Sequence, residues 1–330
     1  GLKVLVKEDH RAPVMVSQVW YKVGSSYEVD GITGISHVLE HMMFKGTDKH
    51  PAGEFSRIIS ENGGSENAFT AQDYTAYFQT MEKSRLPVSF ALEADRMRNL
   101  VLPEDEFLKE VQVVMEERRM RTEDNPQSLT YEQFSATAWA SSPYRTPIIG
   151  WMDDLENLAV DDLRNWYQQW YGPDNATLVV VGDVDPEEVH RQAQKYFGPL
   201  EASEVVAPKP RLEMAQRGMK RIEVKAPAEL PYLLMGYKVP VVRTAELQWE
   251  PYALAVLAGV LDGGTAARLE SQLVRGGEIA ASAGASYDAY DRLDSLFLLS
   301  GTPATGYNME DLERAFVDQI RKLQDEPVTS

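Results

Sequence analysis

The sequence predicts an α+β fold made of two homologous domains, each a mostly antiparallel sheet packed with helices. Three observations support this prediction. Strand-like and helical segments follow one another in both halves, a proline-containing stretch separates the halves, and the second half repeats patterns of the first. We place the first domain at residues 1–198, a linker with scattered charge and no apolar period at 199–217, and the second domain at 218–330.

The first domain opens with two expected strands and continues with helices and strands in alternation. Residues 1–6 alternate apolar and polar side chains, and residues 13–21 are rich in β-branched and aromatic types, so we expect two antiparallel neighbours. Helical spacing of apolar residues predicts helices, whereas short β-branched or aromatic runs predict strands. The expected helices lie at 33–44, 55–60, 85–100 and 103–120, and the further strands at 65–70, 74–80 and 176–181.

The second half repeats the first at a constant offset where the pattern is clearest. Residues 255–265 align without gaps on residues 37–47, and a shorter similarity links 237–239 with 21–23. Such a repeat predicts duplicated domains. The second copy reaches residue 330 before it attains the length of the first, so we expect an incomplete second domain.

Composition excludes several classes of function. The chain has 51 acidic and 33 basic residues and a formal net charge of −18, which argues against a nucleic-acid partner. Cysteine is absent, so histidine and carboxylate side chains must bind any transition metal. No apolar run approaches the roughly 18 residues of a membrane span. The chain starts at Gly1 without an apolar leader, and we expect that the natural N-terminus has been removed.

Two histidines and a glutamate form an H-x-x-E-H pattern in the helix expected at 33–44. His37 and His41 are four residues apart, which places their rings on one face, about 6 Å apart along the axis. Two neutral imidazoles suit Zn²⁺, and the carboxylate of Glu40 could take a proton from water. The alternative is a solvated polar helix face, but this composition predicts roughly 0.01 chance occurrences of the pattern. Zinc is therefore the predicted cofactor.

A third zinc ligand is expected from the helix at 103–120, because a catalytic zinc site has three protein ligands and one open position. Glu110 and Glu117 are seven residues apart and share a face, whereas Glu116 is turned away by about 100°. Taken alone, the charged run at 116–119 is better explained as a solvated helix face. Because the two histidines need a third ligand, a metal-binding role for a glutamate of this helix is favoured here.

The motif and its spacing resemble a known family of enzymes. His37, Glu40 and His41, followed by Glu117 seventy-six residues after His41, resemble the inverted-motif zinc peptidases: pitrilysin, insulin-degrading enzyme and mitochondrial processing peptidase. The resemblance covers the whole chain and points to a short bacterial member with two domains of the mitochondrial processing peptidase/LuxS-like metallohydrolase fold. It implies that His37, His41 and Glu117 are the zinc ligands, that Glu40 is the general base, and that Glu110 is a supporting catalytic carboxylate.

The resemblance also implies a mode of substrate binding. Residues 65–70 resemble the family's exposed edge strand, whose backbone pairs with an extended peptide. Such pairing tolerates most side chains, which fits a peptide or a small unfolded protein as substrate. Asn67, Ala68 and Phe69 would then contact it. Without the resemblance, an ordinary hairpin strand is the preferred interpretation.

The second half lacks the metal-binding groups of the first. The positions aligned with His37, Glu40 and His41 are occupied by alanine, alanine and glycine, so only the first half is expected to bind zinc. In the resembling family, an arginine and a tyrosine seven residues apart in the second half assist catalysis. Arg275 matches the arginine, but Ser282 stands at the tyrosine position, with Tyr287 as an alternative.

These observations predict a zinc-dependent metalloendopeptidase. Because the tyrosine is missing, we expect it to be the catalytic subunit that works with a homologous partner bearing the Arg/Tyr pair, or a homodimer. The alternatives are a non-catalytic scaffold or assembly subunit of the same fold, and a different zinc hydrolase. The resemblance to exported bacterial relatives predicts a periplasmic or secreted location. His10, His50 and His190 are expected at the surface.

Overall fold

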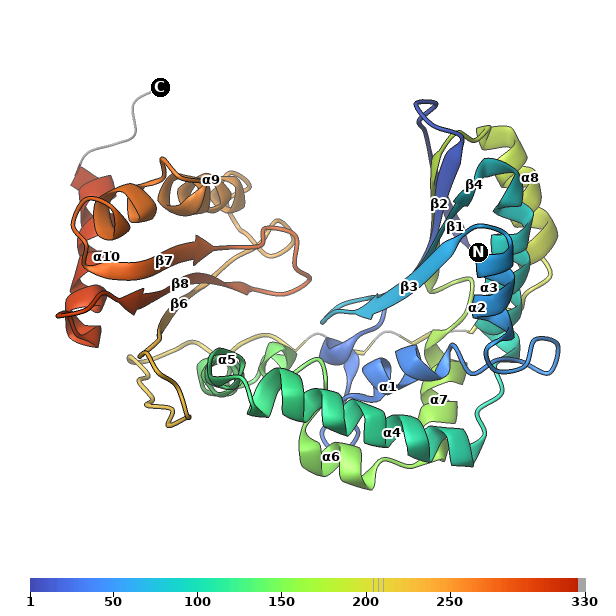
Figure 1. Ribbon diagram of the computed structural model, residues 1–330, viewed down its shortest axis with the longest axis horizontal. Helices are drawn as coiled ribbons and strands as arrows, with labels where there is room; N and C mark the ends of the chain where they lie inside the picture. The colour runs from blue at the N-terminus through green and yellow to red at the C-terminus, as the bar shows by residue number, and fades with distance from the viewer. Residues whose placement is uncertain (204, 207, 210, 326–330) are drawn as a thin grey trace. The chain divides into compact units, whose positions relative to one another are not determined.

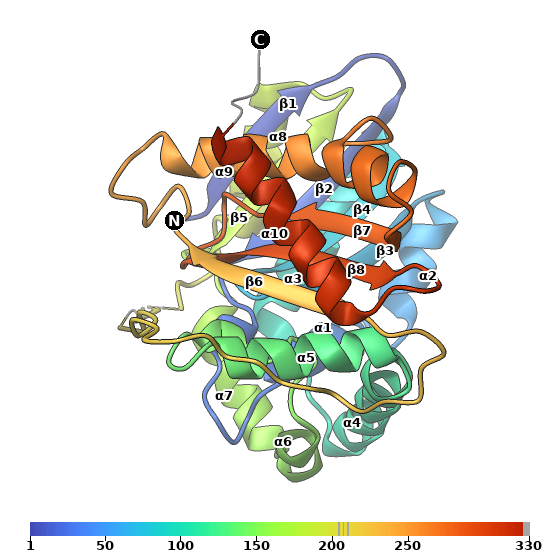
Figure 2. The same ribbon diagram turned by 90° about the vertical axis from the view of Figure 1, so that its left-hand side faces the viewer.

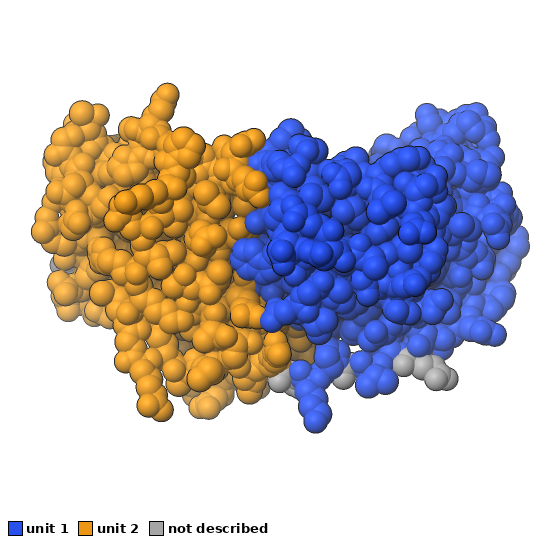
Figure 3. All heavy atoms as spheres, turned by 90° about the horizontal axis from the view of Figure 1, so that it is seen from below, with its two compact units in different colours: residues 1–120, 146–210 blue, residues 121–145, 211–330 orange. Residues whose placement is uncertain are grey.

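The computed structural model describes residues 1–203, 205–206, 208–209 and 211–325, which form two compact units (Figure 3). Unit 1 contains residues 1–120 and 146–210, and unit 2 contains residues 121–145 and 211–330. Residues 204, 207 and 210 of the predicted linker and the last five of the predicted second domain lie outside the described residues. The other linker residues form no helix or strand. Residues 121–145 thus belong to unit 2, although they precede the linker in the chain.

Unit 1 is built on a five-stranded mixed sheet with the order β1-β5-β2-β4-β3 (Figure 1). Strand β2 is antiparallel to β4 and β5, β3 is antiparallel to β4, and β1 is parallel to β5. Strand β3 is therefore at an edge of the sheet. The strands are β1 (Lys3–Glu8), β2 (Val14–Tyr21), β3 (Ser65–Thr70), β4 (Thr75–Glu82) and β5 (Ala176–Gly182).

The expectation that the first two strands are antiparallel neighbours is wrong, because β5 lies between them. Lys3 pairs with Thr177 on one side of β5, and Tyr21 pairs with Ala176 on the other. Apart from Thr177, strand β5 has no polar side chain, and its backbone needs hydrogen-bonding partners along both edges. A central position meets that need, and Leu178 and Val180 become fully buried there.

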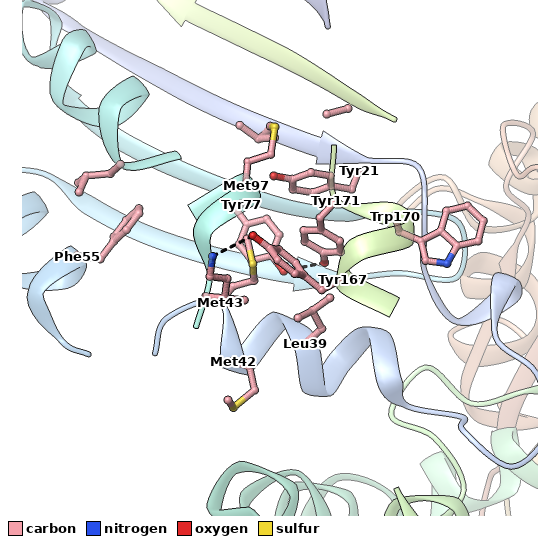
Figure 4. Packing of buried hydrophobic residues seen from close by; sticks show 14 of the residues in the cluster. Tyr21, Leu39, Met42, Met43, Phe55, Tyr77, Met97, Tyr167, Trp170 and Tyr171 are labelled. Carbon is pink, nitrogen blue, oxygen red and sulfur yellow. Dashed lines mark hydrogen bonds between the residues drawn. The ribbon is translucent and has the colours of Figure 1, made fainter. Parts of the chain in front are cut away.

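Helices cover one face of this sheet and continue below it as a second layer (Figure 1). Leu39 of α1 and Met43, the residue directly after α1, point toward the rings of Tyr77 and Tyr167 in the core (Figure 4). The Tyr77 and Tyr171 hydroxyls are 3.0 Å apart, which gives these two buried phenols a hydrogen bond. The helices of unit 1 are α1 (Ile35–Met42), α2 (Glu54–Glu61), α3 (Leu86–Asn99), α4 (Glu104–Arg118), α6 (Met152–Asn157), α7 (Val160–Trp170) and α8 (Pro186–Phe197).

Unit 2 has a three-stranded antiparallel sheet with the order β6-β8-β7, which repeats the order β2-β4-β3 of unit 1. Helix α10 crosses the strands, as Figure 2 shows. Phe297 and Leu299 of β8 belong to the core that α10 covers, whereas Leu296 packs with Trp139 after α5 in a second cluster. The elements are α5 (Pro126–Ala138), β6 (Leu233–Val239), α9 (Glu250–Asp262), β7 (Ala280–Ser286), β8 (Ser295–Pro303) and α10 (Met309–Asp325).

Both units combine sheets with packed helices, and the predicted α+β class is confirmed. Within the described part of the chain, no helix combines the length and apolarity needed to cross a bilayer.

Candidate metal centre and catalytic site

The N-terminus of α1 is held by two carboxylates from other segments of unit 1. Glu28 accepts hydrogen bonds from the backbone N–H groups of Gly34 (2.7 Å) and Ser36 (2.9 Å), and Asp154 accepts one from Thr33 N–H at 3.1 Å. Burial raises the pKa of Glu28 to about 7, although both N–H groups favour its charged form. These contacts satisfy backbone donors that a helix start leaves open, and they fix the helix that carries the H-x-x-E-H motif.

Gly34 is required at this helix start for two reasons. Its φ of 86° lies in the left-handed region, and a Cβ atom there would lie 2.6 Å from the carbonyl oxygen of Ile149. The chain around Gly150, itself at φ 85°, therefore packs directly against the beginning of α1.

His37 and His41 on α1 meet Glu117 on α4 at the centre of the candidate site. The Nε2 atoms of His37 and His41 lie 3.8 Å and 3.5 Å from Glu117 Oε2. The ligand atoms of all three side chains lie within 4.8 Å of one another. Two ligands of a tetrahedral zinc ion are about 3.3 Å apart, given metal–ligand distances of about 2.0–2.1 Å. Two imidazole nitrogens and one carboxylate at these separations fit zinc, and they are the only such group among the described residues.

Glu110 lies behind His41 and connects it to Lys45. Its Oε2 is 3.1 Å from His41 Nδ1, and its Oε1 is 2.5 Å from Lys45 Nζ. A proton on Nδ1 that points to Glu110 leaves the lone pair of His41 on Nε2, the atom that faces Glu117. Glu110 thus orients a candidate ligand and is not itself in the three-residue cluster.

Glu40 is one residue before His41 and contacts the edge strand. Its Oε2 accepts a hydrogen bond of 2.6 Å from the hydroxyl of Thr70, the last residue of β3. The general-base candidate and the strand expected to bind the peptide are therefore in direct contact.

Glu116 and Glu117 have different surroundings, as their helical phase predicts. The Glu116 side chain is 66% exposed and forms an ion pair with Arg119, whereas the Glu117 side chain is 13% exposed and faces the two histidines. Helix α4 thus turns Glu117, and not Glu116, toward α1.

The other histidines are separate from this cluster. His10 and His190 are exposed, as expected. The surface assignment of His50 is wrong, because the side chain is only 21% exposed and its Nδ1 lies 3.6 Å from Glu54. The loop folds back on itself there, with Thr47 N–H donating to the His50 carbonyl oxygen.

The structure brings Asn67, Ala68 and Phe69 together on β3. Phe69 is 37% exposed and packs edge-to-face on Trp20, with 5.4 Å between ring centroids. The Asn67 side chain accepts a hydrogen bond from Ala68 N–H. These three residues line an edge strand that pairs with β4 on one side only.

The second-half candidates belong to unit 2. Arg275 donates to the carbonyl oxygen of Thr265 and lies 3.5 Å from Glu270. Ser282 lies on β7 and is exposed. The Tyr287 hydroxyl donates to the Pro240 carbonyl oxygen at 2.6 Å, so it already has a backbone acceptor.

Three residues near the site were not identified from the sequence: Glu28, Lys45 and Thr70. The acidic residue ahead of the expected helix and the lysine one turn after His41 were weak signals for the first two. The contact between Thr70 and Glu40 joins segments 30 residues apart, and no local pattern indicates it.

Comparisons with known proteins agree on the family. Residues 3–151 match the profile described as Insulinase (Peptidase family M16), and residues 157–330 match the Peptidase M16 inactive domain. The zinc protease PqqE of Helicobacter pylori is 36% identical over all of this chain and 74% of its own length.

Solved structures of proteases share the fold. The crystal structure of a protease from Helicobacter pylori matches with a TM-score of 0.92 and 36% identity, over all of this chain and 79% of the other. The periplasmic protease PqqL from Escherichia coli matches with a TM-score of 0.83 and 21% identity, over all of this chain and 37% of the other. The resemblance drawn from His37, Glu40, His41 and Glu117 is thereby confirmed, and the chain belongs to peptidase family M16, the insulinase family.

Proposed function

We propose that this chain is a zinc-dependent metalloendopeptidase with its reactive centre at His37, His41 and Glu117. The observation that carries the proposal is the convergence of these side chains within 4.8 Å, with a further carboxylate, Glu40, on the same helix as the histidines. Relatives named zinc proteases support it. Zinc, when bound, polarises the scissile carbonyl group and acidifies water.

The side chains have separate tasks in this proposal. The two imidazoles and the Glu117 carboxylate hold the metal, and Glu110 keeps the His41 ring in the orientation that presents Nε2. Glu40 takes a proton from the attacking water at a carboxylate oxygen and then delivers it to the nitrogen of the leaving amine. The proposed site thus contains both the metal ligands and the proton carrier that amide hydrolysis requires.

We further propose that the substrate is a peptide, or a small unfolded protein, that pairs with β3 as an added strand. Strand β3 is an edge strand, and its last residue contacts Glu40. Backbone pairing at Asn67, Ala68 and Phe69 would bring an extended peptide alongside the cluster. A proline in place of Ala68 should weaken cleavage while leaving the zinc content unchanged.

Zinc analysis beside a fluorogenic peptide assay tests the proposal. We expect one zinc ion per wild-type chain, loss of zinc in Glu117→Ala, and retention in the matched control Glu116→Ala, whose side chain is exposed on the same helix. Glu40→Gln should keep zinc and lose turnover by about 10²–10⁴-fold. A metal-free wild-type chain without activity would favour the scaffold alternative, whereas undiminished activity of Glu40→Gln would refute the assignment of Glu40 as the general base.

We also propose that a homologous partner chain with its own sequence supplies the Arg/Tyr pair; a homodimer, in which both copies carry Ser282, is the alternative assembly. The support is that Ser282 occupies the expected tyrosine position and that the Tyr287 hydroxyl is hydrogen-bonded to Pro240. Activity that rises only when the homologous partner is added would support this arrangement, and full activity of a monomer would refute it. We place the protein in the periplasm or outside the cell, as with the periplasmic protease PqqL, and cell fractionation tests this location.

A further inference from the structure

The contact between Thr70 and Glu40 joins two parts of the proposed site that the sequence keeps apart. Thr70 Oγ1 lies 2.6 Å from Glu40 Oε2, a short hydrogen bond to a carboxylate. The backbone of Thr70 is fixed by pairing with Thr75 of β4, and Thr75 is fully buried, with its hydroxyl donating to the Val23 carbonyl oxygen. The hydroxyl that contacts Glu40 is therefore mounted on a well-anchored hairpin.

Strand geometry explains why Thr70 reaches Glu40 and its neighbour does not. Side chains alternate between the two faces of a strand, so Ala68 and Thr70 share one face while Phe69 points to the other. Phe69 accordingly packs on Trp20, and Ala68 packs against the core cluster that includes α1. Only the face of β3 that carries Thr70 is turned toward α1.

We propose that Thr70 is a positioning residue for Glu40 and that it couples the peptide-binding edge strand to the general base. This inference rests on the proposed function. A long glutamate side chain has many rotamers, and a fixed donor selects one of them before substrate arrives. A peptide paired with β3 would hold the same strand, and with it the same hydroxyl.

The test compares two substitutions at position 70 with a control on the same hairpin. Thr70→Val keeps the shape of the side chain but removes the donor, whereas Thr70→Ser keeps the donor. We expect Thr70→Val to lower kcat by about 10–100-fold with KM within about twofold, and Thr70→Ser to recover most of the loss. Thr80→Val, at an exposed position of β4, should behave as wild type.

Two further measurements separate this role from a structural one. Zinc content and chelator competition should be unchanged in Thr70→Val, because Thr70 is not in the ligand cluster. In the metal-free chain, the shifts in melting temperature of Thr70→Val and Glu40→Ala should be non-additive in the double variant, as expected for two groups in contact.

The outcomes that contradict the positioning role differ from the outcome that contradicts the proposed function. An unchanged kcat in Thr70→Val, an equal loss in Thr70→Ser, a change in KM alone, a loss of zinc, or additive melting shifts would each overturn the positioning role while the zinc-loaded wild type remains active. If the zinc-loaded wild type cleaves no peptide, the proposed function fails and this inference fails with it.

Discussion

Replacing Glu110 with glutamine should weaken zinc binding without removing a zinc ligand. In the structure, Glu110 accepts from His41 Nδ1 at 3.1 Å and pairs with Lys45 at 2.5 Å, with only 13% of its side chain exposed. Glutamine keeps an acceptor but loses the charge that holds both neighbours. Loss of such a supporting carboxylate costs about 10–100-fold in metal affinity, which corresponds to about 1.4–2.7 kcal/mol.

The assay is competition for zinc between the protein and a fluorescent chelator at constant pH. Glu106→Gln is the matched control, because Glu106 lies one turn earlier on α4 and 3.7 Å from Lys45, and it pairs closely with Lys109. We expect the affinity of Glu106→Gln to stay within about twofold of wild type, since an exposed pair contributes little. Equal zinc affinity of Glu110→Gln and wild type, or equal losses of zinc affinity in Glu110→Gln and Glu106→Gln, would refute the role of Glu110 in orienting His41.

Three further predictions concern stability, each read from urea unfolding. Burial would raise the pKa of Glu213, but hydrogen bonds from Lys238 and from the N–H groups that follow α5 outweigh it and lower the pKa to about 2. The stabilisation that Glu213 provides should therefore be complete above pH 4.5 and be lost as the pH falls toward 2, which lowers the free energy of unfolding by at most about 3 kcal/mol. An equally steep loss in Glu213→Gln would contradict this origin. Gly34→Ala should cost at least about 2 kcal/mol, because φ is 86° and a backbone oxygen occupies the space; an unchanged urea midpoint would show that this turn can relax. Phe316→Ala should cost about 3–5 kcal/mol because the ring is fully buried, and a loss below about 1 kcal/mol would mean that the core of unit 2 closes around the cavity.

The motif helix could be predicted from the sequence because its chemistry lies within little more than one turn. The spacing of His37 and His41 sets their common face, and the seven-residue spacing of Glu110 and Glu117 distinguishes Glu117 from its exposed neighbour Glu116. The helix and strand segments could be predicted for the same reason, since apolar periodicity is a local property of the sequence.

Contacts between distant elements could not be predicted in this way. The position of β5 between β1 and β2 depends on backbone hydrogen bonds, which any apolar strand can offer. The contacts of Thr70 with Glu40 and of Lys45 with Glu110 could not be predicted either, because neither Thr70 nor Lys45 belongs to a local pattern that indicates its partner.

The placement of residues 121–145 in unit 2 has a consequence for synthesis of the protein on the ribosome. The hydroxyl of Tyr144 accepts hydrogen bonds from the backbone N–H groups of Arg292 and Leu293, which are translated 148 and 149 residues later. At about 5–20 residues per second, that delay lasts about 7–30 s. During this interval Trp139 and Tyr144 lack Leu293 and Leu296, which pack against them in the finished protein. A nascent chain, or a fragment cut at the linker, therefore carries an apolar surface that a chaperone could bind until the second unit is complete.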